Sequence, residues 1–413
     1  MVDQERLELS TSPSVAVRSI QLKLLVHNFL LIIVYQHLVY FNNKFNLDFM
    51  FNSLNEVVIV SALRTPIGTL NGSLKDIKAD ILGSIIIKEI LRKVKCDKEK
   101  IDQVIMGQVL TAGNGQNPAR QASINAGMPF STPAYIVNQV CGSGLRAVVS
   151  GFQSIKLGES KYVIAGGQEN MSASQHSILF RNKKKVLIEE LKDTMIIDGL
   201  LDAFNNYHMG VTAENVAKKF KITREKQDKF ALGSQQKTQI AIKENKFDNE
   251  LVKIEQNNAY LAKDEHPRNG LNIDDLKKLR TVFLKNGTVT PGNSSGINDG
   301  AAALLLTTLE EAQKESLQPL VKIVSWSSVG VDPSLMGLGP IEAVRQAVKK
   351  AKWNLEDIDL FEINEAFAAQ SIAVIHELNI DENKVNVNGG AIALGHPIGA
   401  SGARILVTLI HEM

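Results

Sequence analysis

From residue 56 to the end of the chain, short apolar runs alternate with segments whose apolar residues recur at helical spacing. In the first part of this stretch, runs typical of buried strands occupy residues 57–62, 104–109, 134–140 and 162–166. Segments with the spacing of an amphipathic helix occupy residues 79–94, 118–126 and 144–157. Alternation of this kind predicts parallel sheets covered by helices, which is the α/β class.

The alternation stops at residue 171 and resumes after residue 290. The intervening stretch is charged, with helix formers followed by a loop-like segment, and we interpret it as an insertion. Beyond it, strands are predicted at residues 301–307, 320–325, 360–363 and 385–389. Helices are predicted at residues 341–351 and 365–375 and from residue 400 onward. The pattern therefore predicts two α/β halves, residues 56–170 and 291–413, separated by a loop domain of residues 171–290.

A faint internal repeat supports the division into halves. Ser143-Gly144-Leu145-Arg146 opens a predicted helix in the first half, and Ser401-Gly402-Ala403-Arg404 opens one in the second. A four-residue match is weak by itself, but each copy follows a predicted strand, so both have the same position in their half.

The first 55 residues differ from the rest. Residues 24–41 are uncharged and mostly apolar, and their length just reaches that of a membrane-spanning helix, but four polar residues interrupt them. Three acidic residues near the N-terminus argue against a secretory signal and a mitochondrial presequence. Met50 lies seven residues before the first predicted strand. We therefore expect residues 1–55 to be a disordered or non-native extension, with a membrane anchor and a targeting segment as the alternatives.

Composition narrows the classes of function. The 46 Lys and Arg against 44 Asp and Glu leave a formal net charge of +2, which is too small to gather nucleic acid by counterion release. The only cysteines, Cys96 and Cys141, exclude a disulfide framework and a zinc site with two neighbouring thiolates. The eight histidines show no metal-binding spacing. We expect a metal-free protein of a reducing compartment that does not bind nucleic acid.

Cys141 lies where a predicted strand ends and a predicted helix begins. The glycines Gly142 and Gly144 follow it and allow another backbone or a substrate to come close. Backbone N–H groups at the start of a helix stabilise a thiolate, so Cys141 is a candidate nucleophile. The alternative is an inert buried cysteine, and the local sequence does not decide between the two.

Two further polar residues follow predicted strands. His396 lies in the glycine-rich stretch 388–404, where an imidazole can act as a base near neutral pH or hydrogen-bond within a tight turn. Asn364 can orient a water toward an oxyanion or cap the helix that follows. A nucleophile, a base and an amide at strand ends are the layout of acyl transfer through an activated nucleophile.

Four stretches of the chain resemble motifs of the thiolase family. Three of them contain the candidates above, at residues 138–146, 364–368 and 389–404, and the fourth, residues 292–301, resembles the family's coenzyme A region. The resemblance extends from residue 56 to the last residue, and four long motifs in the family's order are very specific. Asn-Tyr-His-Met-Gly at residues 206–210 resembles the biosynthetic branch, in which a His-Met pair lines a narrow acyl pocket.

This resemblance implies a layered αβαβα fold of two similar halves, a loop domain that holds coenzyme A, and a homotetramer. It implies acetyl-CoA C-acetyltransferase activity, which joins two acetyl-CoA into acetoacetyl-CoA and CoA through an acetyl-cysteine and also runs in reverse. Cys141 then carries the acetyl group and His396 accepts its proton, while His396 and Asn364, the latter through a water, hold the thioester oxyanion. Coenzyme A thioesters are substrates, so no tightly bound cofactor is implied. The residues implied to line the substrate site are Leu200, His208, Met209, Phe283, Ser295, Met336, Ala366 and Phe367.

Two features depart from the family pattern. Thiolases carry a second cysteine in a Cys-x-Gly motif near the C-terminus, which takes a proton from Cα of the incoming acetyl-CoA. The 413 residues contain no such motif, and Cys96, after a basic helix, is no substitute. We therefore expect the sequence to be incomplete and to lack the last strands of the second half. Residues 251–270 are shorter than the family's, which leaves Arg268, Lys263 and the cluster 181–185 as candidates for binding the coenzyme A phosphates.

Two other functions stay open. A thiolase for longer 3-ketoacyl chains is disfavoured by Tyr207-His208-Met209. A thiolase-like coenzyme A binder that no longer condenses would follow from the absent second cysteine. We expect a cytoplasmic protein, with the mitochondrion as the alternative, and no association with membranes.

Overall fold

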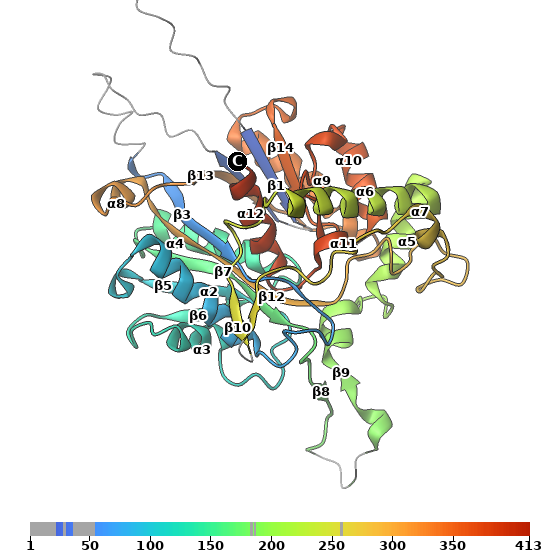
Figure 1. Ribbon diagram of the computed structural model, residues 1–413, viewed down its shortest axis with the longest axis horizontal. Helices are drawn as coiled ribbons and strands as arrows, with labels where there is room; N and C mark the ends of the chain where they lie inside the picture. The colour runs from blue at the N-terminus through green and yellow to red at the C-terminus, as the bar shows by residue number, and fades with distance from the viewer. Residues whose placement is uncertain (1–21, 28–29, 36–53, 182–184, 186, 257–258) are drawn as a thin grey trace, which may run out of the picture.

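The computed structural model describes residues 22–27, 30–35, 54–181, 185, 187–256 and 259–413, the first two of these ranges as backbone (Figure 1). Its centre is a curled sheet of ten strands, in which β4 (Gly68–Thr69) pairs only with β12. The other nine strands, in spatial order, are β14 (Leu360–Ile363), β1 (Leu22–His27), β2 (Leu30–Tyr35), β13 (Val321–Ser328), β3 (Val57–Arg64), β12 (Asn298–Thr308), β7 (Val163–Asn170), β5 (Gln103–Gly107) and β6 (Ala134–Val137).

Helices form three layers around this sheet. Helices α2 (Ala79–Val94) and α3 (Pro118–Asn125) cover the outer face of the first half, and α9 (Gly339–Ala351) and α10 (Ala368–Leu378) cover that of the second. Between the halves lie α4 (Ser143–Lys156) and α12 (Ser401–Glu412), each in contact with strands of both halves. The layered αβαβα fold of two similar halves is therefore confirmed.

Strand β3 shows how the sequence builds these layers. All eight of its residues are buried. Val57 and Ile59 pack into the central cluster with α4 and α12, whereas Val58 and Val60 pack into the outer cluster with α2. Successive side chains of a strand point to opposite faces, so a strand between two helical layers needs an unbroken apolar run.

The pairing differs from the sequence prediction in two respects. The sheet is mixed rather than parallel, because β12 is antiparallel to both β3 and β7 and β13 is antiparallel to β3. Residues 385–389 form no strand and contribute only a bridge between Phe361 and Val385. The side-chain amide of Asn386 occupies this place, since it accepts a hydrogen bond from the N–H of Ile363 (2.8 Å) and donates one to its carbonyl (2.9 Å).

The first 55 residues contribute two strands to the sheet, whereas the sequence led us to expect an extension outside the fold. Strand β1 runs parallel to β14 and antiparallel to β2, and β2 runs antiparallel to β13. The expectation of disorder for residues 1–21, 28–29 and 36–53 lies outside the described residues. Within the part of the chain that the structure describes, no helix is long and apolar enough to cross a membrane.

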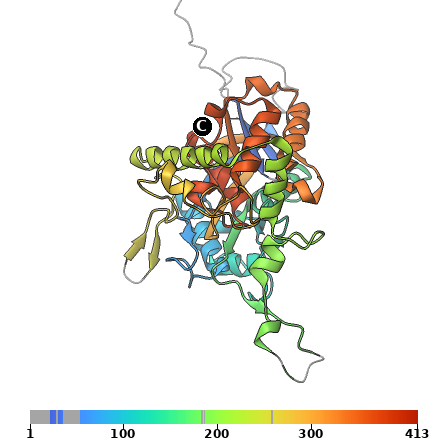
Figure 2. The ribbon, with the colours of Figure 1, turned by 90° about the vertical axis from the view of Figure 1, so that its right-hand side faces the viewer.

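The stretch between the halves contains helices α5 (Met209–Phe220), α6 (Arg224–Lys243) and α7 (Ile273–Lys277) and two small hairpins. One hairpin pairs β8 (His176–Ser177) with β9 (Lys192–Asp193) and projects from the body of the molecule in both views (Figures 1 and 2). The other pairs β10 (Ile254–Gln256) with β11 (Ala259–Leu261). The domain limits at residues 171 and 290 stay a prediction.

The two central helices cross at their N-terminal turns, and glycines make the crossing close. A Cβ added to Gly144 would lie 2.8 Å from the backbone nitrogen of Ala403, and one added to Gly402 would lie 2.5 Å from that of Leu145. Both glycines belong to the four-residue repeat seen in the sequence. The repeat therefore marks equivalent helix starts that are packed against each other.

This crossing predicts a stability effect of Gly402→Ala. The new methyl group meets the backbone of α4, so we expect the free energy of unfolding to fall by about 1–3 kcal/mol, as in overpacked cores. The control is Gly233→Ala in α6, where nothing lies within 4 Å of an added Cβ. That change should raise the free energy of unfolding by roughly 0.5–1 kcal/mol, because glycine is a poor helix former. Urea unfolding followed by circular dichroism measures both, and equal stability of Gly402→Ala and the parent would contradict the interpretation.

Candidate active site

Cys141 lies in the short connection between β6 and α4. The preceding residue, Val140, has a left-handed backbone (φ +47°), which is uncommon for a β-branched residue and turns the chain sharply before the helix. The turn is closed by hydrogen bonds from the N–H of Ser143 to the carbonyl of Val140 (3.0 Å) and from the N–H of Gln139 to the hydroxyl of Ser143 (2.8 Å). The side chain of Cys141 is buried at the N-terminal end of α4.

His396 and Cys141 are in direct contact, although they are far apart in the sequence. His396 Nε2 lies 3.1 Å from Cys141 Sγ, and His396 Nδ1 lies 2.6 Å from the hydroxyl oxygen of Ser401. That hydroxyl donates its one proton to the carbonyl of Pro397 (2.9 Å), so it accepts the proton of Nδ1. The remaining lone pair, on Nε2, therefore faces the sulfur and is placed to accept its proton.

Burial dominates the electrostatics of this pair. It raises the pKa of the Cys141 thiol to about 12, although a hydrogen bond from the backbone of Cys141 itself acts to lower that pKa. It lowers the pKa of the His396 imidazole to about 3. The charge of Glu169 raises the thiol pKa further, and the charge of Arg404 lowers the imidazole pKa further. Both shifts favour an uncharged thiol beside an uncharged imidazole. The sequence led us to expect a helix start that stabilises a thiolate, whereas burial at this position opposes the charged form, and His396 Nε2 is placed to take the proton.

Asn364 follows β14 directly and is buried. Neither its amide oxygen nor its amide nitrogen has a hydrogen-bond partner among the described residues. Helix α10 begins at Ala368 rather than at residue 365, with Phe367 at the capping position, so Asn364 does not cap it. An unpaired buried amide costs about 1–3 kcal/mol, which fits a position that holds a water or a substrate oxygen.

Its neighbour Glu365 ties this strand end to the stretch that carries His396. The carboxylate of Glu365 accepts hydrogen bonds from the N–H of Ile392 (3.2 Å), the hydroxyl of Ser234 (2.7 Å) and the amide of Asn386 (2.8 Å). Burial raises the pKa of Glu365 above its usual value. The end of β14 and the glycine-rich stretch are thus held together from inside the protein.

The eight residues expected to line the substrate site lie in two groups. Leu200 packs in the same apolar cluster as Cys141. His208 stacks on Phe283, with ring centroids 4.6 Å apart, and Phe283 meets Phe367 edge to face at 6.2 Å. The N–H of Ser295 donates to the carbonyl of Ala366 (3.0 Å). The members of the second apolar cluster include Met209, Phe283, Met336, Ala366 and Phe367. Their contact with coenzyme A stays a prediction.

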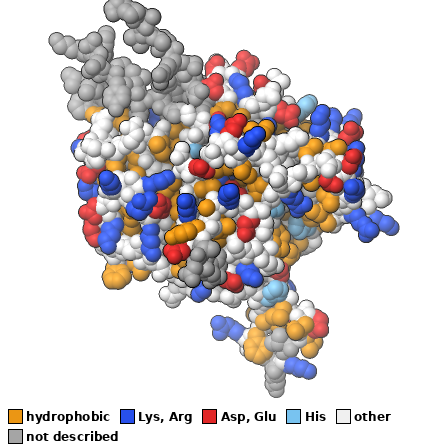
Figure 3. Space-filling view, viewed as in Figure 1, with side chains coloured by type: hydrophobic (Ala, Val, Ile, Leu, Met, Phe, Trp, Pro, Cys, Tyr) orange, Lys and Arg blue, Asp and Glu red, His pale blue; other side chains and the backbone are white. Residues whose placement is uncertain are grey.

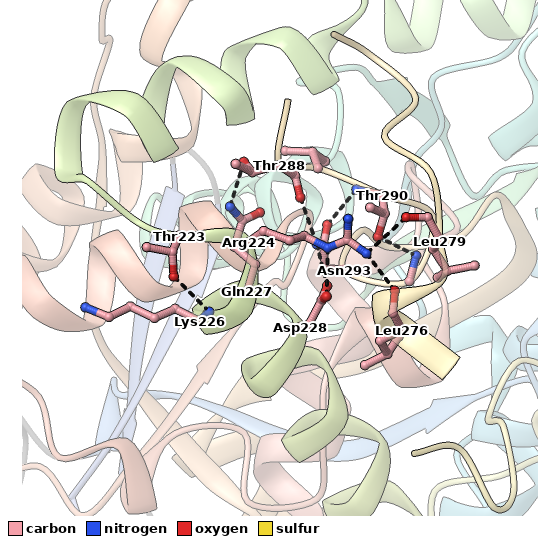
Figure 4. Close-up of polar contacts among 12 residues, drawn as sticks. Thr223, Arg224, Lys226, Gln227, Asp228, Leu276, Leu279, Thr288, Thr290 and Asn293 are labelled. Carbon is pink, nitrogen blue, oxygen red and sulfur yellow. Dashed lines mark hydrogen bonds and ion pairs between the residues drawn. The ribbon is translucent and has the colours of Figure 1, made fainter. Parts of the chain in front are cut away.

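A polar network holds the segment that carries Ser295 (Figure 4). Asp228 of α6 accepts hydrogen bonds from Arg224 (2.7 Å) and from the amide of Asn293 (2.9 Å). Arg224 also donates to the carbonyls of Leu276 (2.6 Å) and Leu279 (3.1 Å). A hollow beside this network is lined by Arg224, Glu225, Asp228, Ile273 and Lys277. None of the catalytic candidates lies on it, and Arg224 is already engaged with protein groups.

Sequence reasoning missed three residues that position His396. Ser401 orients the ring, and Asn298 of β12 accepts a hydrogen bond from the backbone N–H of His396 (2.8 Å). Glu169, at the end of β7, accepts hydrogen bonds from Val109 (3.0 Å), Leu110 (3.3 Å) and Gly399 (3.0 Å), and so joins the first half to the His396 loop. Burial raises the pKa of Glu169 to about 7. Two of these residues could have been identified from the sequence, because Ser401 lies within the glycine-rich motif and Glu169 is a charged residue in a buried strand.

The neutral pair predicts the pH dependence of alkylation of Cys141 by iodoacetamide. The imidazole is a free base above its lowered pKa of about 3 and the thiol keeps its proton below its raised pKa of about 12, so the assisted rate should be flat from pH 5 to pH 9. His396→Asn should slow the reaction by roughly 10²-fold or more and make it rise tenfold per pH unit, because only the rare thiolate then reacts. Peptide mass spectrometry follows Cys141 and Cys96 separately. A parent rate that falls through pH 6.5 would contradict the shifted imidazole.

Comparisons with known proteins agree with this geometry. The family model described as "Thiolase, N-terminal domain" matches residues 57–310, and "Thiolase, C-terminal domain" matches residues 317–413. The rat protein named acetyl-CoA acetyltransferase, cytosolic, is 52% identical over 363 residues, which cover 86% of this chain and 91% of that protein. The acetyl-CoA acetyltransferase of Cupriavidus necator is 51% identical over 366 residues, covering 87% and 93% of the two chains.

Solved structures are similar over the same part of the chain. The Bacillus anthracis acetyl-CoA acetyltransferase superposes with a TM-score of 0.84 at 42% identity and covers 87% of this chain and 93% of its own. The human mitochondrial 3-ketoacyl-CoA thiolase superposes with a TM-score of 0.83 at 41% identity, covering 87% and 92%. Two family models that together match most of the chain, and relatives that share half of its residues, show that this chain belongs to the thiolase family.

Proposed function

We propose that the protein is an acetyl-CoA C-acetyltransferase, which joins two acetyl-CoA into acetoacetyl-CoA and CoA and also catalyses the reverse thiolysis. The observation that carries the proposal is the contact of 3.1 Å between His396 Nε2 and Cys141 Sγ, in a buried place where a proton can move between uncharged partners. The relatives that share half of this sequence are named acetyl-CoA acetyltransferases, in mammals and in bacteria.

The first half-reaction uses Cys141 and His396. The sulfur attacks the thioester carbonyl of acetyl-CoA while its proton passes to His396 Nε2. The tetrahedral intermediate then expels the CoA sulfur, which takes the proton from His396. The acetyl group stays on Cys141 as a thioester. Ser401 and the carbonyl of Pro397 keep Nε2 aimed at the sulfur throughout. The start of α4 offers N–H groups to the developing oxyanion.

The second half-reaction joins a second acetyl-CoA to the acetyl-cysteine. A base removes a proton from its methyl carbon, the carbon attacks the acetyl-cysteine carbonyl, and Cys141 leaves as a thiolate that takes up the proton which the base removed. The free amide of Asn364, through a water, is placed to hold the thioester oxygen of the attacking substrate. The resemblance assigns the base to a second cysteine. Cys96, the other cysteine of the 413 residues, follows α2, packs against the outer cluster and has its pKa raised by burial.

Coenzyme A enters this scheme as part of the substrates and not as a resident cofactor. The stacked rings of His208 and Phe283 and the apolar cluster around Phe367 offer a surface for the pantetheine and acyl groups. Lys263 and Arg268 are exposed on the same connecting segment and are two of the candidates for the phosphates. Of the third candidate, the cluster 181–185, residues 182–184 lie outside the described residues. The similar rat and mouse proteins are named cytosolic, so we propose the cytoplasm as the compartment, with the mitochondrion as the alternative.

Mass spectrometry of the protein mixed with acetyl-CoA tests the assignment. We expect one added acetyl group, on the peptide that contains Cys141, and none on Cys96. Cys141→Ser should abolish the adduct, and Cys96→Ser should leave it unchanged. Acetoacetyl-CoA formation, measured in the same mixture, separates the two half-reactions. An adduct without product would support the condensation-impaired alternative, and no adduct on Cys141 would exclude both.

We also propose that the protein assembles as a homotetramer, as the resemblance implies. The projecting β8–β9 region is rich in exposed apolar side chains, which gather on it in the space-filling view (Figure 3). The exposed apolar residues of this region and of its flank are Leu179, Phe180, Leu187, Ile188, Leu191 and Phe204. Exposed apolar groups on a projecting hairpin support an interface between copies of the chain.

The mass of the particle in solution tests this assembly. The double change Leu179→Ser and Ile188→Ser, at side chains 76% and 79% exposed, should reduce the molar mass measured by light scattering to about half that of the parent, because removing apolar contacts weakens association. Leu157→Ser, at a side chain 74% exposed next to α4, is the control and should leave the mass unchanged. A parent that scatters as a monomer or dimer would refute the tetramer.

A further inference from the structure

Helix α12 carries a row of polar side chains through the interior of the protein. Its residues from Ser401 to Ile410 are all buried. Ser401, Arg404 and Thr408 are three and four residues apart, so they lie on one face of the helix, and the residues between them are glycine or apolar. A buried helix packs with apolar side chains all round, so this polar face needs a reason other than packing.

The polar face begins at the active site. The hydroxyl of Ser401 accepts the proton of His396 Nδ1 (2.6 Å). Arg404 follows about one helical turn later; its Nη1 donates a hydrogen bond to the hydroxyl of Thr408 (3.5 Å) and lies 3.9 Å from Glu362 Oε2. A buried guanidinium is therefore fixed close behind the residue that orients the imidazole.

Glu362 connects this helix to β14. Its two neighbours in the strand, Phe361 and Ile363, pack into the outer cluster, so Glu362 points to the central layer, where α12 lies. The strand ends directly before Asn364. The ion pair of Arg404 and Glu362 therefore joins α12 to the strand that delivers this amide.

The two buried arginines of this region differ in how their charges are balanced. Arg64 of β3 has two carboxylates at hydrogen-bond distance, those of Glu250 (2.5 Å) and Asp264 (2.7 and 2.9 Å). The ion pair of Arg404 is longer, and burial raises the pKa of Glu362 to about 8, so this partner is mostly protonated at neutral pH. The positive charge of Arg404 is thus less compensated than that of Arg64.

This charge acts on the His396 imidazole. Burial is the larger cause of the lowered imidazole pKa, and the charge of Arg404 lowers that pKa further. A positive charge opposes the formation of a second one nearby. It therefore favours the uncharged imidazole, which is the form that can accept a proton from Cys141.

We propose that Arg404 is a positioning residue for the reaction, which acts on Cys141 through His396. From the polar face of α12, its positive charge keeps the imidazole uncharged at rest and favours the release of the proton that the imidazole takes up during acetyl transfer. Glu362 and Thr408 hold the guanidinium in place. This role rests on the proposed function, because acetyl transfer is the reaction in which the imidazole accepts and releases a proton.

Other charged groups surround this arrangement. Those that act on Arg404 are Arg64 of β3, Glu250 after α6, and Glu362 and Glu365 at the end of β14. Strand β1 also contacts α12, and its titratable residues are Lys23 and His27. Glu169 of β7 holds Gly399 and raises the pKa of Cys141. All of these groups are retained when Arg404 alone is changed, so a changed pH profile reports this one charge.

Alkylation of Cys141 by iodoacetamide at pH 4 and pH 7, in a Cys96→Ser background, tests the proposal without acetyl-CoA. In the parent, the imidazole pKa of about 3 leaves a free base at both pH values, so the ratio of the rate at pH 4 to that at pH 7 should be near one. Arg404→Met removes the charge and raises the imidazole pKa. More imidazole is then protonated at pH 4, and the ratio should fall by about threefold or more. Arg404→Lys keeps the charge and should retain the ratio of the parent.

Two further variants separate the charge from the packing. Thr408→Val disturbs the same polar face without changing a charge, so it should alter the rate equally at both pH values. Arg404→Met combined with Glu362→Gln also removes the carboxylate, and it should show the same fall in the ratio as Arg404→Met. Circular dichroism at both pH values checks folding, and the double variant replaces Arg404→Met in the comparison if the single variant unfolds at pH 4.

Three results would overturn the proposal. They are a parent-like ratio in Arg404→Met, an equal fall in Arg404→Lys, and recovery of the parent ratio in the double variant. Acetylation of Cys141 by acetyl-CoA together with a parent-like ratio in Arg404→Met would refute the role of Arg404 and leave the proposed function standing.

Discussion

The close crossing of α4 and α12 is the constraint on which the rest of the molecule depends. Backbone lies against backbone there, because Gly144 and Gly402 have no side chain that would hold the helices apart. Each helix follows the loop that carries one reacting group, so the crossing brings a sulfur from one half and an imidazole from the other into contact at 3.1 Å. The surrounding strands and outer helices keep the two helix starts at this separation. The buried carboxylate of Glu169 does the same, because it accepts hydrogen bonds from Val109 in one half and Gly399 in the other.

The same crossing determines the electrostatics. A site formed between two halves is far from water, and the loss of hydration moves the pKa values of Cys141 and His396 apart rather than together. The uncharged resting pair avoids the cost of two buried charges. With an uncharged resting pair, charge develops only when a substrate is present to share it, and the start of a helix is a favourable place for a developing negative charge.

Much of the fold could be read from the sequence, because buried strands and amphipathic helices have distinct periods. The alternation located β3, β5, β7, α2 and α4, and the motifs located Cys141, His396 and Asn364. Strand direction could not be read, since a buried run looks the same in either direction. The side-chain amide of Asn386 pairs with the backbone of Ile363 in place of a strand, and hydrophobic periodicity gives no sign of such a contact. The apolar run at residues 24–41 was ambiguous because membrane lipid and the interior of a sheet select the same residue types.

The side chain of Asn298 must both accept one hydrogen bond and donate another, which restricts the residue types that fit this position. Its oxygen accepts the backbone N–H of His396 at 2.8 Å, while its nitrogen donates to the carbonyl of Gly68 at 2.9 Å. Aspartate has the right shape but no proton to give, leucine has neither group, and glutamine is one methylene too long for a fully buried site. None of these three residues can therefore replace Asn298. Deamidation of Asn298 would replace its hydrogen bond to the Gly68 carbonyl by a repulsion between two oxygens.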